Sequence, residues 1–211
     1  MQDTENKIIQ MPDFPELTFD ETSHIYRLDG DVIPSVSEIM TPLSTAKYKG
    51  ISDRTLNNAA NKGSAVHDAI EFWIKYGVVD IEKEHAGYFN AFLRWWEKEK
   101  PVVIGSENRV YHPILQYGGT VDLYCLTGQS EPTLVDYKCT YQLSEMTCRV
   151  QLEAYSQALA SHDLPVMKKN ILHLKKDETY EYRPFLAKDP VAWRVFGNLK
   201  GVYDYLKSYQ N

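Results

Sequence analysis

The chain has 211 residues, of which 43% are hydrophobic and 12% aromatic, enough to bury one sizeable core, and we interpret residues 1–211 as a single domain. A formal net charge of −6 argues against a large nonspecific surface for nucleic acid, but it leaves room for local basic patches. No apolar stretch is long enough to cross a bilayer and the first residues lack the features of a signal peptide, so we expect a soluble, cytoplasmic protein without a membrane partner.

The N-terminal part of the chain predicts a hairpin attached to a larger core. We expect residues 1–16 to be flexible and residues 17–50 to form a hairpin and a linker. The hairpin would run from Leu17 to Val36 and turn at Asp29-Gly30, because Asp-Gly favours two-residue turns. Pro42 falls in the linker that leads to the core, residues 51–211.

An amphipathic helix is predicted from about Asp53 to Tyr76, with Gly77 as its stop. His67 lies on the face formed by its small and apolar residues, and Glu71 follows one turn later. A buried imidazole there is a candidate metal ligand. A lone histidine on an apolar helix face is more often a hydrogen-bonded core residue, so both interpretations stay open.

A second helix, from about Glu82 to Lys100, is followed by three predicted strands, near residues 102–111, 118–126 and 133–138. Asp122 and Asp136 lie within or directly after apolar runs of the second and third strands. An ionised carboxylate is costly to bury unless a cation or a donor accompanies it. Lys138 is two residues after Asp136 and therefore shares its face of the strand. Taken alone, Asp-x-Lys favours an ordinary salt bridge over a catalytic pair.

The remaining elements are a helix from Ser144 to about Ser161, a hairpin from about Asn170 to Phe185, and a last helix from Asp189-Pro190. Gln151 and Tyr155 lie one turn apart on the first of these helices, a spacing that can hold a phosphate or a lysine. The last helix has a continuous apolar stripe, suited to packing against a sheet or a partner subunit: Trp193, Phe196, Leu199, Val202, Tyr203 and Leu206. This order of elements predicts an α/β fold with a central mixed β-sheet flanked by helices. In that sheet, the second and third strands would place the two aspartates side by side.

Cysteines and basic residues give weaker indications. Cys125, Cys139 and Cys148 have no paired spacing, which favours buried core thiols in a reducing compartment and excludes a four-cysteine iron–sulfur cluster. Zinc is disfavoured because no Cys/His pair has suitable spacing. Candidate basic patches for nucleic acid, each equally consistent with solvated surface charge, are Lys168-Lys169, Lys175-Lys176 and Arg149.

Four short motifs occur in a fixed order along the chain. They are Gly-x-x-x-His-x-x-x-Glu at 63–71, Gly-Gly-Thr-Val-Asp at 118–122, Val-Asp-Tyr-Lys at 135–138 and Gln-x-x-x-Tyr at 151–155. In this order they resemble the RecB-like branch of the PD-(D/E)XK nuclease superfamily. Residues 19–26 and 33–37 are similar to phage and mitochondrial genome-maintenance exonucleases of that branch. The chain departs from many relatives at Cys139, which stands where they have threonine.

The resemblance implies a restriction-endonuclease-like core with the N-terminal hairpin attached. It also implies that His67, Asp122, Asp136 and the backbone carbonyl of Tyr137 ligate a metal, and that Lys138 positions or activates the attacking water. Gln151, Tyr155 and Glu71 would support the site or the substrate. Mg²⁺ prefers oxygen ligands whereas imidazole suits Mn²⁺ better, so either ion is expected.

By the same resemblance, we expect a metal-dependent DNA exonuclease in phage or prophage replication, recombination or repair. Its partners would be DNA and a recombination or replication protein. Two alternatives stay open: a catalytically silent DNA-binding or assembly subunit that keeps the fold, and a structure-specific endonuclease.

Overall fold

The core is a five-stranded mixed sheet, seen here in a computed structural model that describes residues 10–128 and 130–209. Its strands, in spatial order, are β4 (Val102–His112), β5 (Tyr117–Thr127), β6 (Glu131–Lys138), β7 (Lys168–Leu174) and β8 (Tyr180–Phe185). Neighbouring strands are antiparallel except for β6 and β7, which are parallel. A parallel pair needs a crossover, and helix α5 supplies it.

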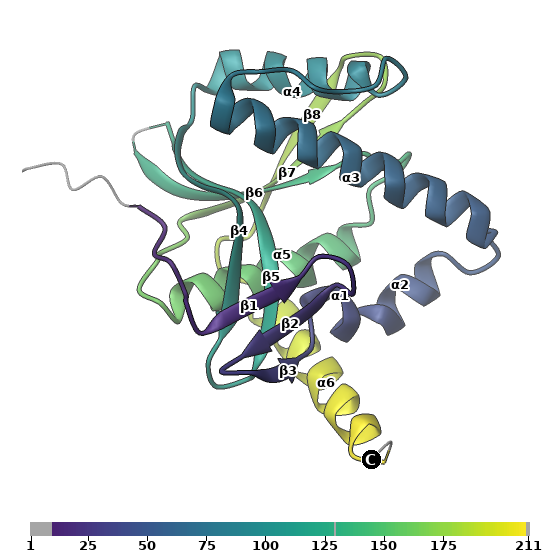
Figure 1. Cartoon of the computed structure of the whole chain (residues 1–211), viewed down its shortest axis with the longest axis vertical. Coiled ribbons are helices and arrows are strands. Elements are labelled where there is room, and N and C mark those ends of the chain that lie inside the picture. The colour runs from purple at the N-terminus through teal and green to yellow at the C-terminus, as the bar shows by residue number, and fades with distance from the viewer. Residues whose placement is uncertain (1–9, 129, 210–211) are drawn as a thin grey trace, which may run out of the picture.

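Helices cover both faces of this sheet (Figure 1). One face carries α3 (Asp53–Tyr76) and α4 (Ala86–Glu99), and the other carries α5 (Glu145–Ala160) and α6 (Pro190–Lys207). Each face has its own apolar cluster, and Leu123 and Leu134 contribute to opposite ones. The predicted α/β fold, a central mixed sheet flanked by helices, is confirmed.

Helix ends follow local capping chemistry. The Ser52 hydroxyl accepts the Thr55 N–H at 3.3 Å, and Gly77 ends α3 in the left-handed region at φ 69°. Ser144 caps α5 in the same way. Helix α4 starts at Ala86, not at Glu82 as predicted, because the preceding residues are polar and offer no apolar face to pack.

The N-terminal hairpin is in fact a three-stranded antiparallel sheet of β1 (Leu17–Asp20), β2 (Ile25–Leu28) and β3 (Asp31–Ile33). The predicted turn at Asp29-Gly30 joins only β2 and β3. A second turn joins β1 to β2, and Asp20 holds it, since its Oδ1 accepts the N–H groups of residues 22 and 23 at 2.9 Å.

The predicted linker contains two short helices, α1 (Val36–Ile39) and α2 (Thr41–Lys47). Ser35 and Glu38 form a reciprocal capping box at the start of α1. Pro42 lies in the first turn of α2, where the missing N–H costs nothing, so this proline marks a helix start and not a linker.

Residues 10–16 pack against the sheet, contrary to the predicted flexibility. Met11 is buried and its N–H donates to the carbonyl of Ile104 at 3.3 Å. The Phe14 ring lies edge-on to Tyr111, with centroids 5.5 Å apart. Residues 1–9, the rest of the segment expected to be flexible, lie outside the described residues.

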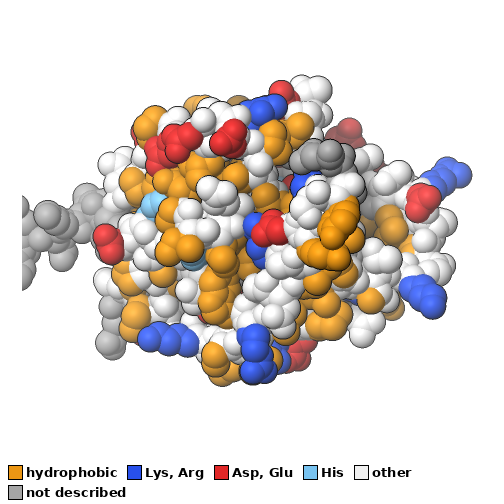
Figure 2. Space-filling model, turned by 90° about the horizontal axis from the view of Figure 1, so that it is seen from below, with side chains coloured by type: hydrophobic (Ala, Val, Ile, Leu, Met, Phe, Trp, Pro, Cys, Tyr) orange, Lys and Arg blue, Asp and Glu red, His pale blue; other side chains and the backbone are white. Residues whose placement is uncertain are grey.

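The apolar stripe of α6 packs against the core as far as Tyr203, but not along its whole width or length. Phe196 is buried, whereas Val202 and Leu206 are 52% and 57% exposed where the helix projects beyond the sheet. Figure 2, which views the molecule from that end, shows apolar side chains between scattered charges and no continuous basic face. Among the described helices, none combines the length and the apolarity needed to span a bilayer.

Candidate functional site

The two predicted aspartates meet where β5 and β6 separate. The last paired residues are Leu123 and Val135, so continuing the register places Asp122 opposite Asp136. There the Asp122 Oδ2 accepts the backbone N–H of Tyr137 at 2.6 Å, in place of a strand-to-strand bond. The pairing of the two strands therefore ends at Asp122, and both aspartates stay buried beneath the residues that line the cleft described below.

His67 of α3 reaches this point from above the sheet. Its Nδ1 lies 3.7 Å from Asp122 Oδ1 and 3.2 Å from Glu107 Oε1. One ligand atom from each of the three residues lies within 4.8 Å of the others. One imidazole nitrogen and two carboxylates form a donor set that suits a divalent cation such as Mn²⁺ or Mg²⁺.

Glu107 is the member of this cluster that the sequence did not reveal. It lies on β4, beyond a register shift between Val103 and Gly105, and has a φ of 49°. This left-handed conformation costs a non-glycine residue about 1–2 kcal/mol, and such strain recurs at functional sites. The only signal in the sequence was an acid within a strand, which many exposed strand edges share.

Asp136 forms a separate pair with Lys138. The Lys138 Nζ is 2.5 Å from Asp136 Oδ2, so the prediction that both share one face is confirmed. Tyr137 points to the other face, where its ring packs edge-on to Phe92. The Asp136 side chain is only 2% exposed, and apart from this ion pair neither of its oxygens has a hydrogen-bond partner among the described residues. A buried carboxylate of this kind is costly unless a further cation binds nearby.

The pKa values show how strongly these charges interact. Burial lowers the pKa of His67, but the carboxylates of Asp122 and Glu107 outweigh it and raise that pKa to about 9. Burial raises the pKa of Asp136 to about 6 although the Lys138 ammonium opposes it, and burial also raises the pKa of Asp122. Burial lowers the pKa of Lys138, but Asp136 and Asp122 hold it above its ordinary value. Without metal, the site therefore retains protons that a bound cation would displace.

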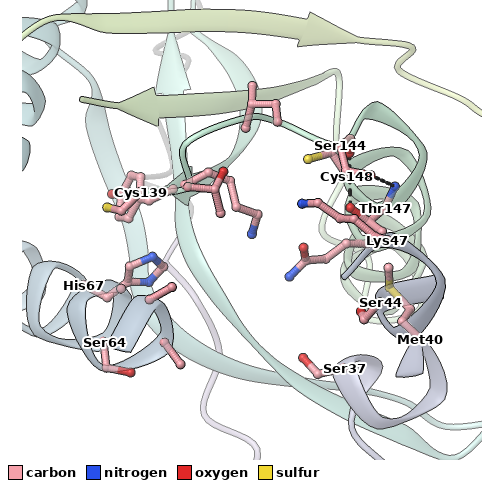
Figure 3. A pocket seen from close by; sticks show the side chains of 18 of the residues that line it. Ser37, Met40, Ser44, Lys47, Ser64, His67, Cys139, Ser144, Thr147 and Cys148 are labelled. Atoms are coloured by element: carbon pink, nitrogen blue, oxygen red, sulfur yellow. Dashed lines mark hydrogen bonds between the residues drawn. The ribbon is translucent and has the colours of Figure 1, made fainter. Parts of the chain in front are cut away.

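A cleft of about 620 Å³ gives access to this site. In Figure 3, His67 and Ser64 of α3 lie on one side, and Lys47 and Ser44 of α2 lie across from them. Glu107, Lys138 and Gln151 also line it, and several hydroxyl groups do so from α1, α2, α3 and the start of α5: Ser37, Ser44, Ser64, Ser144 and Thr147. A wall of hydroxyl and ammonium donors suits an anionic, phosphate-bearing ligand.

The supporting residues divide into two groups. Gln151 lines the cleft, and Tyr155 packs over Gly119, where an added Cβ would lie 2.5 Å from the Tyr155 ring. That contact explains the second glycine of the Gly-Gly motif. Glu71 is not brought to the site: its carboxylate pairs with Lys75 on the outer part of α3, and it does not line the cleft.

The basic residues considered for nucleic acid are mostly occupied within the protein. Lys169 is completely buried in an ion pair with Glu153, and Arg149 makes two hydrogen bonds to Asp189, at 2.7 and 3.0 Å. Lys168 pairs with Glu131 and Lys175 with Glu181, and both ion pairs lie on the surface. The Lys169 prediction was wrong, because this lysine is buried and ties β7 to α5. Arg149 is 37% exposed, and its ion pair with Asp189 ties α5 to the start of α6. The three cysteines are buried free thiols, as predicted.

Replacing His67 with alanine should weaken Mn²⁺ binding more than it weakens folding. The imidazole contacts two carboxylates at the edge of the cleft and is half-buried, so its removal leaves no large cavity in the core. Calorimetric titration with Mn²⁺, together with thermal melting, tests this. Unchanged Mn²⁺ affinity with a melting temperature several degrees lower would show that His67 only packs.

Comparisons with known proteins add little to this geometry. No protein-family model and no curated protein match the chain. Among solved structures it is similar to an alkaline exonuclease (LHK-Exo) from Laribacter hongkongensis, at 13% identity and a TM-score of 0.42, over 83% of this chain and 92% of that one. LHK-Exo in complex with dAMP is similar at 12% identity and the same TM-score, over 84% and 93% of the two chains. Likeness this distant assigns neither a family nor an activity to the chain.

Proposed function

We propose that the protein is a metal-dependent deoxyribonuclease that hydrolyses phosphodiester bonds, acting as an exonuclease in phage or prophage DNA replication, recombination or repair. One observation carries the proposal: a cluster of His67, Glu107 and Asp122 lies beside a buried Asp136–Lys138 pair, at a cleft lined with hydroxyl groups. The ordered nuclease-like motifs of the sequence contain four of these residues, His67, Asp122, Asp136 and Lys138, but not Glu107.

The side chains present fit a divalent cation. His67, Glu107 and Asp122 would hold it, with Asp136 and the carbonyl of Tyr137 as further predicted ligands. The incompletely partnered oxygens of Asp136 support this, since a cation would offset the cost of burying them. Bound Mg²⁺ or Mn²⁺ would supply a water of lowered pKa and neutralise negative charge on the scissile phosphate.

The chain's own groups would do the remaining work. The ammonium of Lys138, held in place by Asp136, would hold the attacking water and donate hydrogen bonds to developing negative charge. Gln151 and the hydroxyl groups of the cleft would bind phosphate oxygens and orient the strand. This proposal extends to DNA as substrate, a recombination or replication protein as partner, and a cytoplasmic location.

A nuclease assay on defined substrates tests the proposal. End-labelled linear single- and double-stranded DNA and closed circles are incubated with the protein in Mg²⁺, Mn²⁺ or EDTA. We expect cleavage of linear DNA only, and only with metal. Cleavage of closed circles would favour the endonuclease alternative. Binding without cleavage under every condition would favour a catalytically silent subunit and contradict the proposal.

The metal-free protein should lose stability as the pH rises from about 4 to about 9, and Mn²⁺ should restore it. The pKa values of Asp136 and His67 are raised in the folded state, to about 6 and about 9. Their stabilising protons are present below the unfolded values of 3.8 and 6.5 and are lost as the pH rises through the folded values. Thermal melting in EDTA and in Mn²⁺ measures both effects. His67→Gln is the control, because it should remove the loss of stability above about pH 6.5. If the melting temperature falls equally with pH in both proteins, the pH dependence does not come from His67.

A further inference from the structure

A second cavity, of about 400 Å³, lies beside the cleft that gives access to the His67 cluster. Ser37 lines both cavities. Gln151 and Tyr155, one turn apart on α5, line the cleft and the second cavity respectively. An extended ligand bound in the cleft therefore has room to place an adjoining group in the second cavity.

The second cavity is walled by aromatic rings. Phe19 packs against Tyr26, with centroids 4.4 Å apart and planes at 38°, and against His24 at 5.7 Å. The Tyr26 hydroxyl is 2.7 Å from Thr120 Oγ1, which fixes that ring to β5. Tyr155 reaches the cavity wall only because Gly119 has no side chain. These contacts fix the rings of Phe19, Tyr26 and Tyr155 before any ligand binds.

The turn between β1 and β2 places His24 at this cavity. Asp20 Oδ1 accepts two backbone N–H groups of the turn, and His24 follows with a φ of 54°. A left-handed histidine costs about 1–2 kcal/mol, yet its ring is exposed and gains little packing in return. An exposed ring held in this way beside Phe19 is available to stack on a flat ligand.

The cleft has aromatic residues too, but the Lys47 ammonium covers the Tyr48 ring and the buried Tyr137 ring packs against His67 and Phe92. The cleft walls near the metal cluster are mainly hydroxyl, small and charged side chains, which suit phosphate and sugar. We propose that the aromatic cavity of Phe19, His24, Tyr26 and Tyr155 holds a nucleobase of the DNA strand whose backbone lies in the cleft. This inference rests on the proposed function. The base held there is unpaired, and aromatic stacking of this kind contributes about 1–3 kcal/mol per base.

Oligonucleotide binding with a movable abasic site tests the inference. Fluorescence anisotropy in Ca²⁺ would measure the affinity of single-stranded oligonucleotides that lack one base at successive positions. We expect His24→Ala and Phe19→Leu to weaken binding of the intact oligonucleotide about 5-fold or more. Both variants should bind as tightly as the wild type when the missing base is the one that occupies the cavity. Phe72→Leu, which removes an exposed ring outside both cavities, is the matched control and should bind normally.

The outcomes separate this inference from the proposed function. If the variants bind like the wild type, or if their loss of affinity is equal at every abasic position, the base subsite is wrong and a cleaving wild type keeps the function. If the wild-type protein neither binds nor cleaves DNA, both proposals fail. His24→Ala alters an exposed side chain, so a folding defect in Phe19→Leu would leave the test intact.

Discussion

Asp136→Asn should lower the rate of metal-dependent DNA cleavage by roughly 10³-fold or more, while leaving the fold intact. The substitution removes a carboxylate charge without changing the volume, in a side chain whose oxygens lack hydrogen-bond partners apart from the Lys138 ion pair. Asp122→Asn should have a similar effect because Asp122 belongs to the metal cluster. Cleavage rates with Mg²⁺ and Mn²⁺ measure both losses.

The thermal stability of the Asp136→Asn variant gives a second test of the site. Burial raises the pKa of Asp136 to about 6, so the ionised carboxylate destabilises the metal-free fold above that pH by up to about 3 kcal/mol. Asp136→Asn removes that cost but leaves the Lys138 ammonium without its partner, so its melting temperature in EDTA near pH 8 should stay within a few degrees of the wild type. Glu131→Gln is the matched control: it also removes a β6 carboxylate paired with a lysine at 2.5 Å, but far from the cleft. Wild-type turnover in either aspartate variant would overturn the site.

Lys138→Ala should retain metal and DNA binding but lose about 10²–10⁴-fold in cleavage rate. The Lys138 ammonium pairs with Asp136 and lines the cleft without belonging to the His67 cluster, so we assign it to the chemical step. Single-turnover rates at saturating DNA, together with binding measurements in Ca²⁺, separate the two roles.

Lys138→Arg distinguishes chemistry from simple charge. Guanidinium keeps the charge but has neither the compact geometry of an ammonium nor its ability to release a proton, so we expect no rescue. Substantial activity in the arginine variant, or loss of DNA binding in the alanine variant, would indicate that Lys138 only holds phosphate. Lys75→Ala is the control, since Lys75 also pairs with a carboxylate but lies outside the cleft.

Elements governed by local chemistry were predictable from the sequence. The bounds of α3 follow from Ser52 and Gly77, whose cap and left-handed conformation depend on neighbouring residues only. The shared face of Asp136 and Lys138 follows from the period of a strand. The α/β order of elements was visible for the same reason, because apolar periodicity distinguishes helices from strands.

Elements governed by distant contacts were not predictable. The sequence placed Lys169 in a surface patch, but the fold buries it against Glu153, sixteen residues away on another element. The sequence also placed Glu71 at the site. In the structure α3 carries this side chain past the end of the cleft, where it pairs with Lys75. The Lys169 outcome depends on a residue of another element, and the Glu71 outcome depends on where the tertiary fold places the cleft along α3.

The sequence by itself determined that Asp122, Asp136 and Lys138 lie on neighbouring strands and His67 on a helix, because strand and helix periods are local properties. Only the tertiary structure decided which of them share a cluster. The β4 register shift and the left-handed backbone of Glu107 turn that carboxylate toward His67, while the pairing of β5 and β6 ends at Asp122 and leaves Asp136 with Lys138. Register shifts and the ends of strand pairing arise from the packing of whole elements, so no short motif encodes them.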